Sequence, residues 1–536
     1  MMKKYFLAHK VLVFKHVLAC LLAAGLMVGN AFVIQGLTSV ALSQNLRQFV
    51  QMALFAVVFL IVEAYFDYVP RVTKAKAVQS ITASLRQDLL RHDIETPLAQ
   101  VEAEASSLRV SRLVNELAVI EESYLKPIFS CILTIFTFVF SLIAALWLQS
   151  QLTLLMVSLS FIPLLAPLIN QRVLANKKQI SVAAQKNLLG VYEEIAVNLS
   201  TIRLRLAGST FTQRFQKVNQ QLAFAKTDFE GSQGKTYAIS YGLSNIVYSG
   251  TWIIGGFFVF QDWLTLPELI AMTALMSTIA GPIQMLSEYV SDLSASRKVV
   301  TNFLQTIQPA EKVTGEPLKE TIHAIELRNV TYSRGERQIL SHLSYTFFIG
   351  KRYAIIGESG VGKSTLLSLI LGIQNAQNVF VNNQAIATLD KADYWQQIAY
   401  VPQKTAIFEG TLSENITLFQ KGDPIQLAQA LKRAGLANLL EELSLSGNLD
   451  AVRRLSGGEE RRLDIARALY RKAPVLILDE PTTGLDRKNE RAIGELLTSL
   501  EEQLVIAVTH SRDSEFLKNF DVVLELQAGV LKEHVL

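Results

Sequence analysis

The stretch YAIIGESGVGKSTLLSLILG, residues 353–372, decides the fold of the C-terminal part of this chain. A short apolar strand leads into a glycine-rich loop, and an apolar helical pattern follows directly. The loop fits G-x-x-x-x-G-K-S, in which glycines allow backbone N–H groups to face phosphates. Lys363 is expected to reach the β- and γ-phosphates, and the Ser364 hydroxyl to ligate Mg²⁺. The expected binding residues are Gly357, Ser359, Gly360, Gly362, Lys363, Ser364 and Thr365.

A second apolar strand, PVLILDE at residues 474–480, ends in two carboxylates. Asp479 fits a position that holds Mg²⁺ through a water molecule. Glu480 fits a general base that polarises an attacking water. The alternative for Glu480 is a side chain that merely faces solvent at a strand end.

Composition separates this region from the rest of the chain. The 536 residues are 50% hydrophobic and only 18% charged, whereas soluble proteins are about a quarter charged. The excess apolar residues lie in roughly the first 300 residues, in runs long enough to cross a bilayer. Six spans are predicted, at residues 14–40, 49–69, 127–148, 152–172, 237–260 and 265–290.

Lysine and arginine orient these spans. The segments 70–126 and 172–236 are rich in both residues, whereas the short loops contain Arg47 and otherwise neither. The positive-inside rule therefore predicts that the long segments and both termini are cytoplasmic. Helical periodicity in the long segments predicts that the spans continue well beyond the membrane.

The organisation of the chain follows from a change of composition at residues 305–321. Pro, Gly and charged residues replace the apolar runs there, which predicts a linker. The predicted fold class is a membrane all-α six-helix domain at 1–304, followed by a soluble α/β P-loop NTPase domain at 322–536. The net charge of +4 gives no sign of nucleic acid, and no such partner is expected. Cys20 and Cys131 lie in apolar runs and are expected to be packing residues.

Three motifs together resemble a known family. The glycine-rich loop, LSGGE at 455–459 and VLILDE at 475–480 occur in the order and spacing of an ATP-binding cassette. The whole chain resembles an ABC half-transporter of the exporter type, with the type IV fold. The resemblance implies ATP and Mg²⁺ as cofactors and ATP hydrolysis coupled to transport. The implied roles are adenine stacking by Tyr332, Mg²⁺ sensing by Gln403, γ-phosphate contact by His510, a signature loop at Ser456, Gly457 and Gly458, and an interface loop that ends at Asp486.

The resemblance also implies a dimer. Two cassettes face each other head to tail, so the Lys363 loop of one and the Ser456–Gly458 segment of the other enclose one ATP. The partner is a second copy or a different half-transporter. Glu459, where glutamine is common, leaves the heterodimer open, and LSLSGNLDAVRRLSGG lacks a segment that usually precedes the signature. The implied location is a bacterial plasma membrane, with the lipid bilayer as a further partner.

The sequence also contains candidates for the segments that couple the two domains and for a residue that contacts the cargo. DIETPLAQ at 93–100 and AGSTFTQ at 207–213 resemble the two coupling segments of the family. Among the polar residues within the spans, Glu63 is the best candidate for a cargo contact. Its alternative role is a hydrogen bond between helices, or a water-facing position in the lower cavity. The expected function is export of a peptide, lipid or drug-like molecule; an ATP-gated regulator and an importer are the alternatives.

Overall fold

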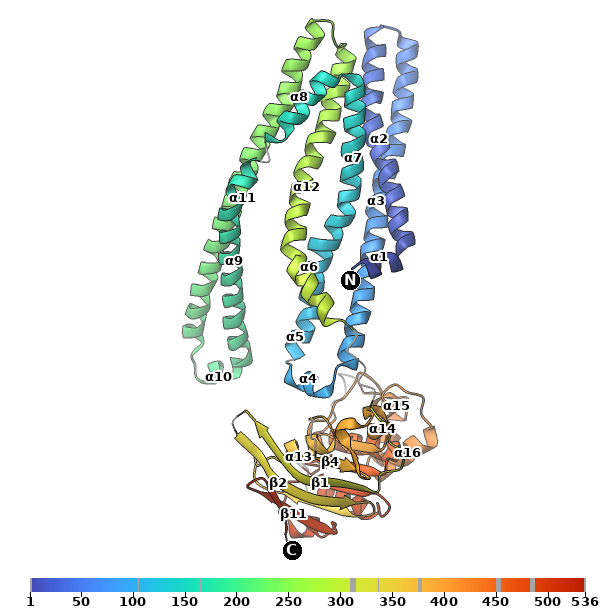
Figure 1. Ribbon diagram of the computed structural model, residues 1–536, viewed down its shortest axis with the longest axis vertical. Helices are drawn as coiled ribbons and strands as arrows, with labels where there is room; N and C mark the ends of the chain where they lie inside the picture. The colour runs from blue at the N-terminus through green and yellow to red at the C-terminus, as the bar shows by residue number, and fades with distance from the viewer. Residues whose placement is uncertain are drawn as a thin grey trace. The chain divides into compact units, whose positions relative to one another are not determined.

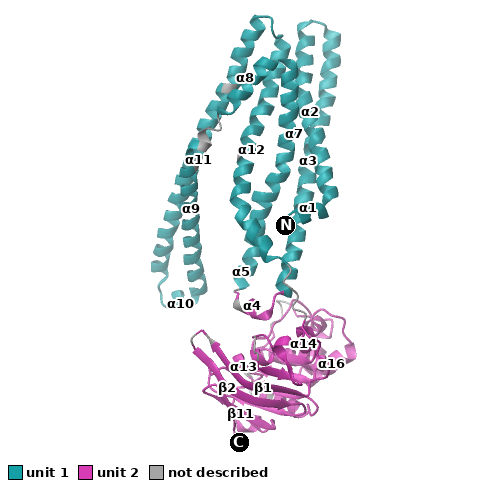
Figure 2. Ribbon diagram, viewed as in Figure 1, with its two compact units in different colours: residues 1–95, 105–308 teal, residues 96–104, 309–536 magenta. Residues whose placement is uncertain are grey.

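The computed structural model describes residues 2–104, 106–162, 165–308, 315–335, 337–374, 378–449, 455–482 and 487–534. The chain forms two compact units, which Figure 2 shows in separate colours. Unit 1 comprises Met1–Glu95 and Ala105–Gln308, and unit 2 comprises Thr96–Glu104 and Pro309–Leu536. The predicted fold class is confirmed, because unit 1 is helical and unit 2 is an α/β domain. The sequence predicted a membrane domain over all of residues 1–304, whereas Thr96–Glu104 belongs to unit 2.

Unit 1 consists of long helices joined by short turns (Figure 1). Helix α2 packs against α3, α7 and α12, while α9 pairs with α11 along its length. Figure 1 shows the α9–α11 pair diverging from α12 towards α10. The bounds are α1 Lys3–Ala8, α2 Lys10–Leu42, α3 Leu46–Glu95, α5 Ser106–Ser111, η1 Arg112–Glu116, α6 Leu117–Ile120, η2 Glu121–Leu125, α7 Lys126–Leu148, α8 Ser150–Ser160, α9 Leu165–Val197, α10 Leu199–Leu204, α11 Gly208–Phe260 and α12 Leu266–Thr306.

Five helical stretches among the described residues are long and apolar enough to cross a membrane. They contain four of the six predicted spans in full and a fifth, 265–290, from Leu266 onward, and they continue beyond them, as α3 does to Glu95. The fourth predicted span, 152–172, is not a single described helix, because α8 ends at Ser160 and α9 begins at Leu165. Pro163, which lies outside the described residues, follows α8 closely, and a proline disfavours the helical conformation in the residue before it. The five stretches are Lys10–Leu42, Leu46–Glu95, Ser106–Leu148, Gly208–Phe260 and Leu266–Thr306.

The two segments predicted to couple the domains are turns between long helices. Residues 93–100 contain the end of α3 and the start of α4 (Leu98–Ala103), and α4 belongs to unit 2. Residues 207–213 contain the N-cap of α11, Ala207, and the first residues of that helix, which follows the short helix α10. Within unit 2, Glu102 of α4 is close enough to Tyr400 to contribute to its electrostatic environment. The docking of the second segment on a cassette remains a prediction.

Glu63 of α3 lies near Asn30 of α2, close enough for the Asn30 amide to influence its carboxylate. A polar contact between helices is the less specific of the roles expected for Glu63. A cargo contact for Glu63 remains a prediction.

Unit 2 contains two principal sheets among its described residues. The first is antiparallel in the order β2-β1-β4-β5. The second has the order β12-β11-β3-β10-β9-β6, with β12 antiparallel and the others parallel. The bounds are β1 Ala324–Arg334, β2 Arg337–Phe348, β3 Arg352–Ile356, β4 Val379–Val381, β5 Gln384–Ala385, β6 Ile398–Val401, β7 Gly410–Thr411, β8 Asn448–Leu449, β9 Val475–Asp479, β10 Leu504–Val508, β11 Val522–Gln527 and β12 Val530–Glu533.

Short helices cover the parallel sheet and bury both of its faces. Strands β9 and β10 are buried at all five positions, as expected for strands at the centre of a parallel sheet. Because β3, β9 and β10 are parallel, their carboxyl ends lie at one edge of the sheet. The helix bounds are α13 Lys363–Ile370, η4 Ile386–Thr388, α14 Lys391–Gln396, α15 Leu412–Thr417, α16 Pro424–Arg433, α17 Ala437–Leu443, α18 Gly457–Arg471, α19 Arg487–Thr498 and α20 Ser514–Leu517.

Candidate active site

The glycine-rich loop connects the carboxyl end of β3 to the first turn of α13. Gly360 and Gly362 have φ angles of 78° and 114°, which favour glycine over other residues. A Cβ on Gly362 would also approach Ile339 to 2.7 Å. The loop conformation therefore depends on these glycines, and it presents the N-terminus of α13 to an anion.

Lys363 extends back into this loop. Its side chain is buried, and Nζ donates to the carbonyl oxygens of Gly357 at 2.7 Å and Glu358 at 2.8 Å. Nζ also lies 3.3 Å from Nδ1 of His510. Burial lowers the pKa of Lys363, while the charges of Glu480 and Asp479 oppose that shift. The ammonium group therefore lies within the loop, held by carbonyl groups that a phosphate could replace.

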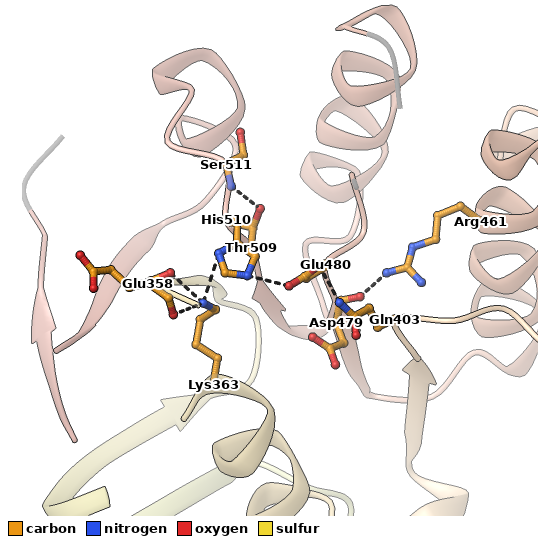
Figure 3. A network of polar contacts seen from close by, with 10 residues as sticks. Glu358, Lys363, Gln403, Arg461, Asp479, Glu480, Thr509, His510 and Ser511 are labelled. Carbon is orange, nitrogen blue, oxygen red and sulfur yellow. Dashed lines mark hydrogen bonds and ion pairs between the residues drawn. The ribbon is translucent and has the colours of Figure 1, made fainter. Parts of the chain in front are cut away.

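Glu480 is contacted from two sides. Its Oε1 lies 2.8 Å from Nε2 of His510, and its Oε2 accepts a hydrogen bond of 3.0 Å from Nε2 of Gln403 (Figure 3). The carboxylate is mostly buried, with 11% of the side chain exposed, so it does not simply face solvent at a strand end. The structure thus brings together Lys363, His510, Glu480 and Gln403, which are far apart in the sequence.

Asp479 supplies a second, more deeply buried carboxylate. Its side chain is 7% exposed, and burial together with the charge of Glu480 raises its pKa. A divalent cation near these two carboxylates would relieve both effects, so the residues fit Mg²⁺. Among the described residues, no three His, Cys, Asp or Glu side chains converge as a metal site. A magnesium ion here would therefore need phosphate oxygens as ligands, as is usual for Mg²⁺.

The predicted signature segment begins helix α18. Ser456 is the N-cap, and its hydroxyl oxygen accepts a hydrogen bond from the Glu459 backbone N–H at 3.3 Å. The Glu459 carboxylate accepts hydrogen bonds from the Ser456 N–H at 2.8 Å and hydroxyl at 2.9 Å. This capping box places a negative charge at the helix N-terminus. The pattern S-x-x-E could have revealed it in the sequence.

Two other predicted residues have different outcomes. Tyr332 of β1 is partly buried, and its hydroxyl donates to Oε1 of Gln374 at 3.3 Å. Its role in adenine stacking remains a prediction. Asp486 lies outside the described residues, so the structure does not place the predicted interface loop.

Arg461 is a residue of this site that the sequence reasoning missed. It is buried, and its guanidinium donates to the carbonyl oxygens of Pro402 and Asp479. The helical period gave a weak sign that Arg461 is buried, because it lies four residues before Ile465 on the same buried face of α18. Nothing in the sequence indicated its two acceptors.

Comparisons with known proteins agree with the division of the chain into a membrane part and a cassette. The family model for the ABC transporter transmembrane region matches residues 13–283, and the model for the ABC transporter matches residues 340–483. The chain belongs to the ABC transporter family. It therefore joins an ATP-hydrolysing cassette to the membrane region of a transporter.

Individual relatives show how far this likeness extends. The ABC transporter chain is 35% identical to the glutathione/L-cysteine transport system protein CydC of Escherichia coli over 271 residues, which are 48% of this chain and 45% of CydC. It is 26% identical to the ATP-dependent lipid A-core flippase of Francisella novicida over 475 residues, 85% of this chain and 79% of the flippase. A bacterial Atm1-family ABC exporter with ATP bound has the same fold, with a TM-score of 0.76 at 20% identity, over 98% of this chain and 94% of that one.

Proposed function

We propose that this ABC transporter exports its cargo and hydrolyses ATP at a site built from Lys363, Gln403, Glu480 and His510. The observation that carries the proposal is the contact of Glu480 with both Gln403 and His510 beside the phosphate loop. A cassette with these groups in mutual contact has the parts needed to activate a water for attack on a phosphate.

The proposed chemistry follows from the positions of the side chains. Lys363 exchanges its contacts with the loop carbonyls for the β- and γ-phosphates. Glu480 accepts a proton from the attacking water, and Gln403 and His510 hold its carboxylate in one orientation. Mg²⁺ held by Ser364, Gln403 and, through water, Asp479 would neutralise charge on the phosphates.

The proposed active assembly is a dimer with composite sites. In a head-to-tail pair, the Ser456–Gly458 turn of one chain closes over ATP bound to the Lys363 loop of the other. Among its described contacts, Ser456 bonds to Glu459 of its own helix and not to the Lys363 loop. The first N–H groups of a helix have no acceptor within the helix, so those of Gly457 and Gly458 can bind a nucleotide on another chain. The partner is a second copy or a different half-transporter.

Outward transport of a lipid, peptide or drug-like molecule is the proposed direction and cargo class. The likeness to a lipid A-core flippase over most of both chains supports an amphipathic cargo. The positive charge of segments 70–126 and 172–236 supports a cytoplasmic location for both termini and the cassette. Because the relatives and the structural neighbour are bacterial, the proposed location is a bacterial plasma membrane.

The test uses the purified chain in lipid vesicles beside its Glu480→Gln form. Because glutamine cannot accept the proton, the ATPase rate should fall about 100-fold or more while ATP binding persists. Transport of a fluorescent lipid out of the cassette-facing leaflet should fall with it. Transport at an unchanged rate in the Glu480→Gln form would refute a hydrolysis-driven exporter and favour an ATP-gated regulator. Movement in the opposite direction would indicate an importer.

A further inference from the structure

Arg461 occupies an unusual environment for a charged residue. It lies in the first turns of α18, five residues after Ser456, and only 5% of it is exposed. Burial lowers its pKa, and the charges of Asp464, Asp479 and Glu480 oppose that shift. Burying a guanidinium costs free energy, so the groups to which Arg461 bonds indicate why it is buried.

The guanidinium donates hydrogen bonds to two backbone carbonyls, which lie at the ends of two different strands. One amino group donates to the Pro402 carbonyl, which directly precedes Gln403 after strand β6. The other donates to the Asp479 carbonyl, which directly precedes Glu480 after strand β9 (Figure 3). One side chain therefore bonds to the backbone immediately before each of two residues of the proposed site.

The peptide between Asp479 and Glu480 is fixed on both of its sides. Its carbonyl accepts from Arg461, and its N–H, which belongs to Glu480, donates to the Val508 carbonyl at 2.8 Å. Glu480 itself has a φ of 55°, a left-handed conformation that a side chain rarely adopts. Such a conformation persists only where the surroundings hold it, and it determines where the carboxylate points.

We propose that Arg461 is a positioning residue for ATP hydrolysis: its guanidinium fixes the backbone at Pro402 and Asp479, and thereby the positions of Gln403 and Glu480. The planar fork of arginine can donate in two directions at once, whereas a lysine ammonium is a point donor on a flexible stem. The geometry of the fork, and not its charge alone, is the property that matters.

A consequence for the dimer rests on the proposed function. Ser456 and Arg461 belong to the same rigid helix, so a shift of α18 on contact with the ATP of the partner chain also moves the guanidinium. Through its bonds to the Pro402 and Asp479 carbonyls, the moving guanidinium shifts Gln403 and Glu480 of the same chain. Arg461 thereby links closure over one ATP to the alignment of the water-activating residues at the other.

The test compares Arg461→Lys with Arg471→Lys. Arg471 lies at the other end of α18, where it donates to the Trp395 carbonyl at 2.5 Å. Both changes retain the charge and remove a guanidinium that bonds to backbone. ATPase rates are measured across ATP concentrations and divided by the amount of bound fluorescent ATP analogue, which discounts any unfolded protein.

Arg461→Lys is expected to lower kcat about 10- to 100-fold, because a displacement near 1 Å has that effect on catalysis. KM for ATP should change less than about 3-fold, since the Lys363 loop is untouched. Arg471→Lys should retain the wild-type kcat. A kcat for Arg461→Lys equal to that of Arg471→Lys would overturn the proposal. If the Glu480→Gln change left the wild-type rate intact, the proposed function would fail instead.

Mixed dimers purified through two different tags show on which site Arg461 acts. When one chain carries both Arg461→Lys and Glu480→Gln, the remaining Glu480 has an intact Arg461 in its own chain. This dimer should retain about half of the wild-type rate, since one of two sites is intact. When the two changes are on different chains, the rate should fall as far as with Arg461→Lys alone. An equal rate in both arrangements would contradict action within one chain.

Discussion

Replacing Glu459 by glutamine should strengthen ATP-dependent closure of the proposed dimer. The Glu459 carboxylate accepts a hydrogen bond from the Ser456 hydroxyl at 2.9 Å, so its charge lies at the helix end that would receive the γ-phosphate. Glutamine preserves the capping box, because its side-chain oxygen can accept the same bonds. The change therefore removes a charge and leaves the turn in place.

The size of the effect follows from the distances in the capping box. A phosphate oxygen that accepted the Ser456 hydroxyl proton in place of Glu459 would lie about 5 Å from the Glu459 carboxylate, given hydrogen bonds of usual length. Two unit charges at that separation repel by about 0.8 kcal/mol in water and about 3 kcal/mol at a dielectric constant of 20. Ser456 is exposed and Glu459 half-buried, which favours the lower value. About 1 kcal/mol corresponds to a roughly 5-fold lower KM for ATP.

The assay measures ATPase activity against ATP concentration in lipid vesicles at low and high salt. Glu460→Gln is the matched control, because it removes the same charge in the same helical turn but lies outside the capping box. Glu459→Gln should lower KM about 5-fold at low salt and less at high salt, where screening weakens the repulsion. Glu460→Gln should change KM less than 2-fold, which is about the scale of a screened surface charge.

An unchanged or higher KM in Glu459→Gln would refute this reasoning, since the carboxylate would then not oppose the nucleotide. A fall of equal size in Glu460→Gln would show that only the net charge of the helix end matters. The same experiment bears on the partner. If the wild-type chain alone is inactive and Glu459→Gln restores hydrolysis, its own signature segment is the weak element, as a heterodimer would require.

Two further predictions concern the cassette. Lys363→Met leaves the carbonyls of Gly357 and Glu358 without their donor and removes the charge expected to bind phosphate. Binding of a fluorescent ATP analogue should therefore weaken about 10- to 100-fold, as for loss of a charged hydrogen bond. Unaltered binding would contradict this. Asp521 accepts two hydrogen bonds from the Arg352 side chain, at 2.7 and 3.1 Å, which hold its pKa below the ordinary value. Asp521→Asn should lower the free energy of unfolding by about 1 kcal/mol at pH 7 after allowance for solvent screening. The difference should shrink as the pH falls from about 4 through the depressed pKa of folded Asp521, because protonation removes the charge that Arg352 stabilises. Chemical denaturation at several pH values measures the difference, and a difference of undiminished size at about pH 2 would exclude the ion pair as its cause.

The sequence predicted the features that depend on neighbouring residues. The strand, glycine-rich loop and helix around Lys363 form one continuous segment, so their local pattern sufficed. The apolar runs likewise predicted membrane-spanning helices, because their length alone sets whether they can cross a bilayer. The capping box of Ser456 and Glu459 was not predicted, although it spans only four residues and its S-x-x-E pattern is local.

Other features depended on how distant segments pack. Thr96–Glu104 joins unit 2 through contacts made in the folded chain, whereas its sequence neighbours belong to unit 1. Composition could not predict this grouping, because it is decided by packing.

The sequence by itself determined that this chain binds a nucleotide and has membrane spans, because both properties reside in contiguous patterns. Only the tertiary structure decided that Arg461 bonds to the carbonyls of Pro402 and Asp479. Those three residues come from α18 and from the ends of β6 and β9, which are adjacent only because the parallel sheet places β6 beside β9. Strand order in a sheet is set by the burial of whole faces, a property that no local pattern of residues contains.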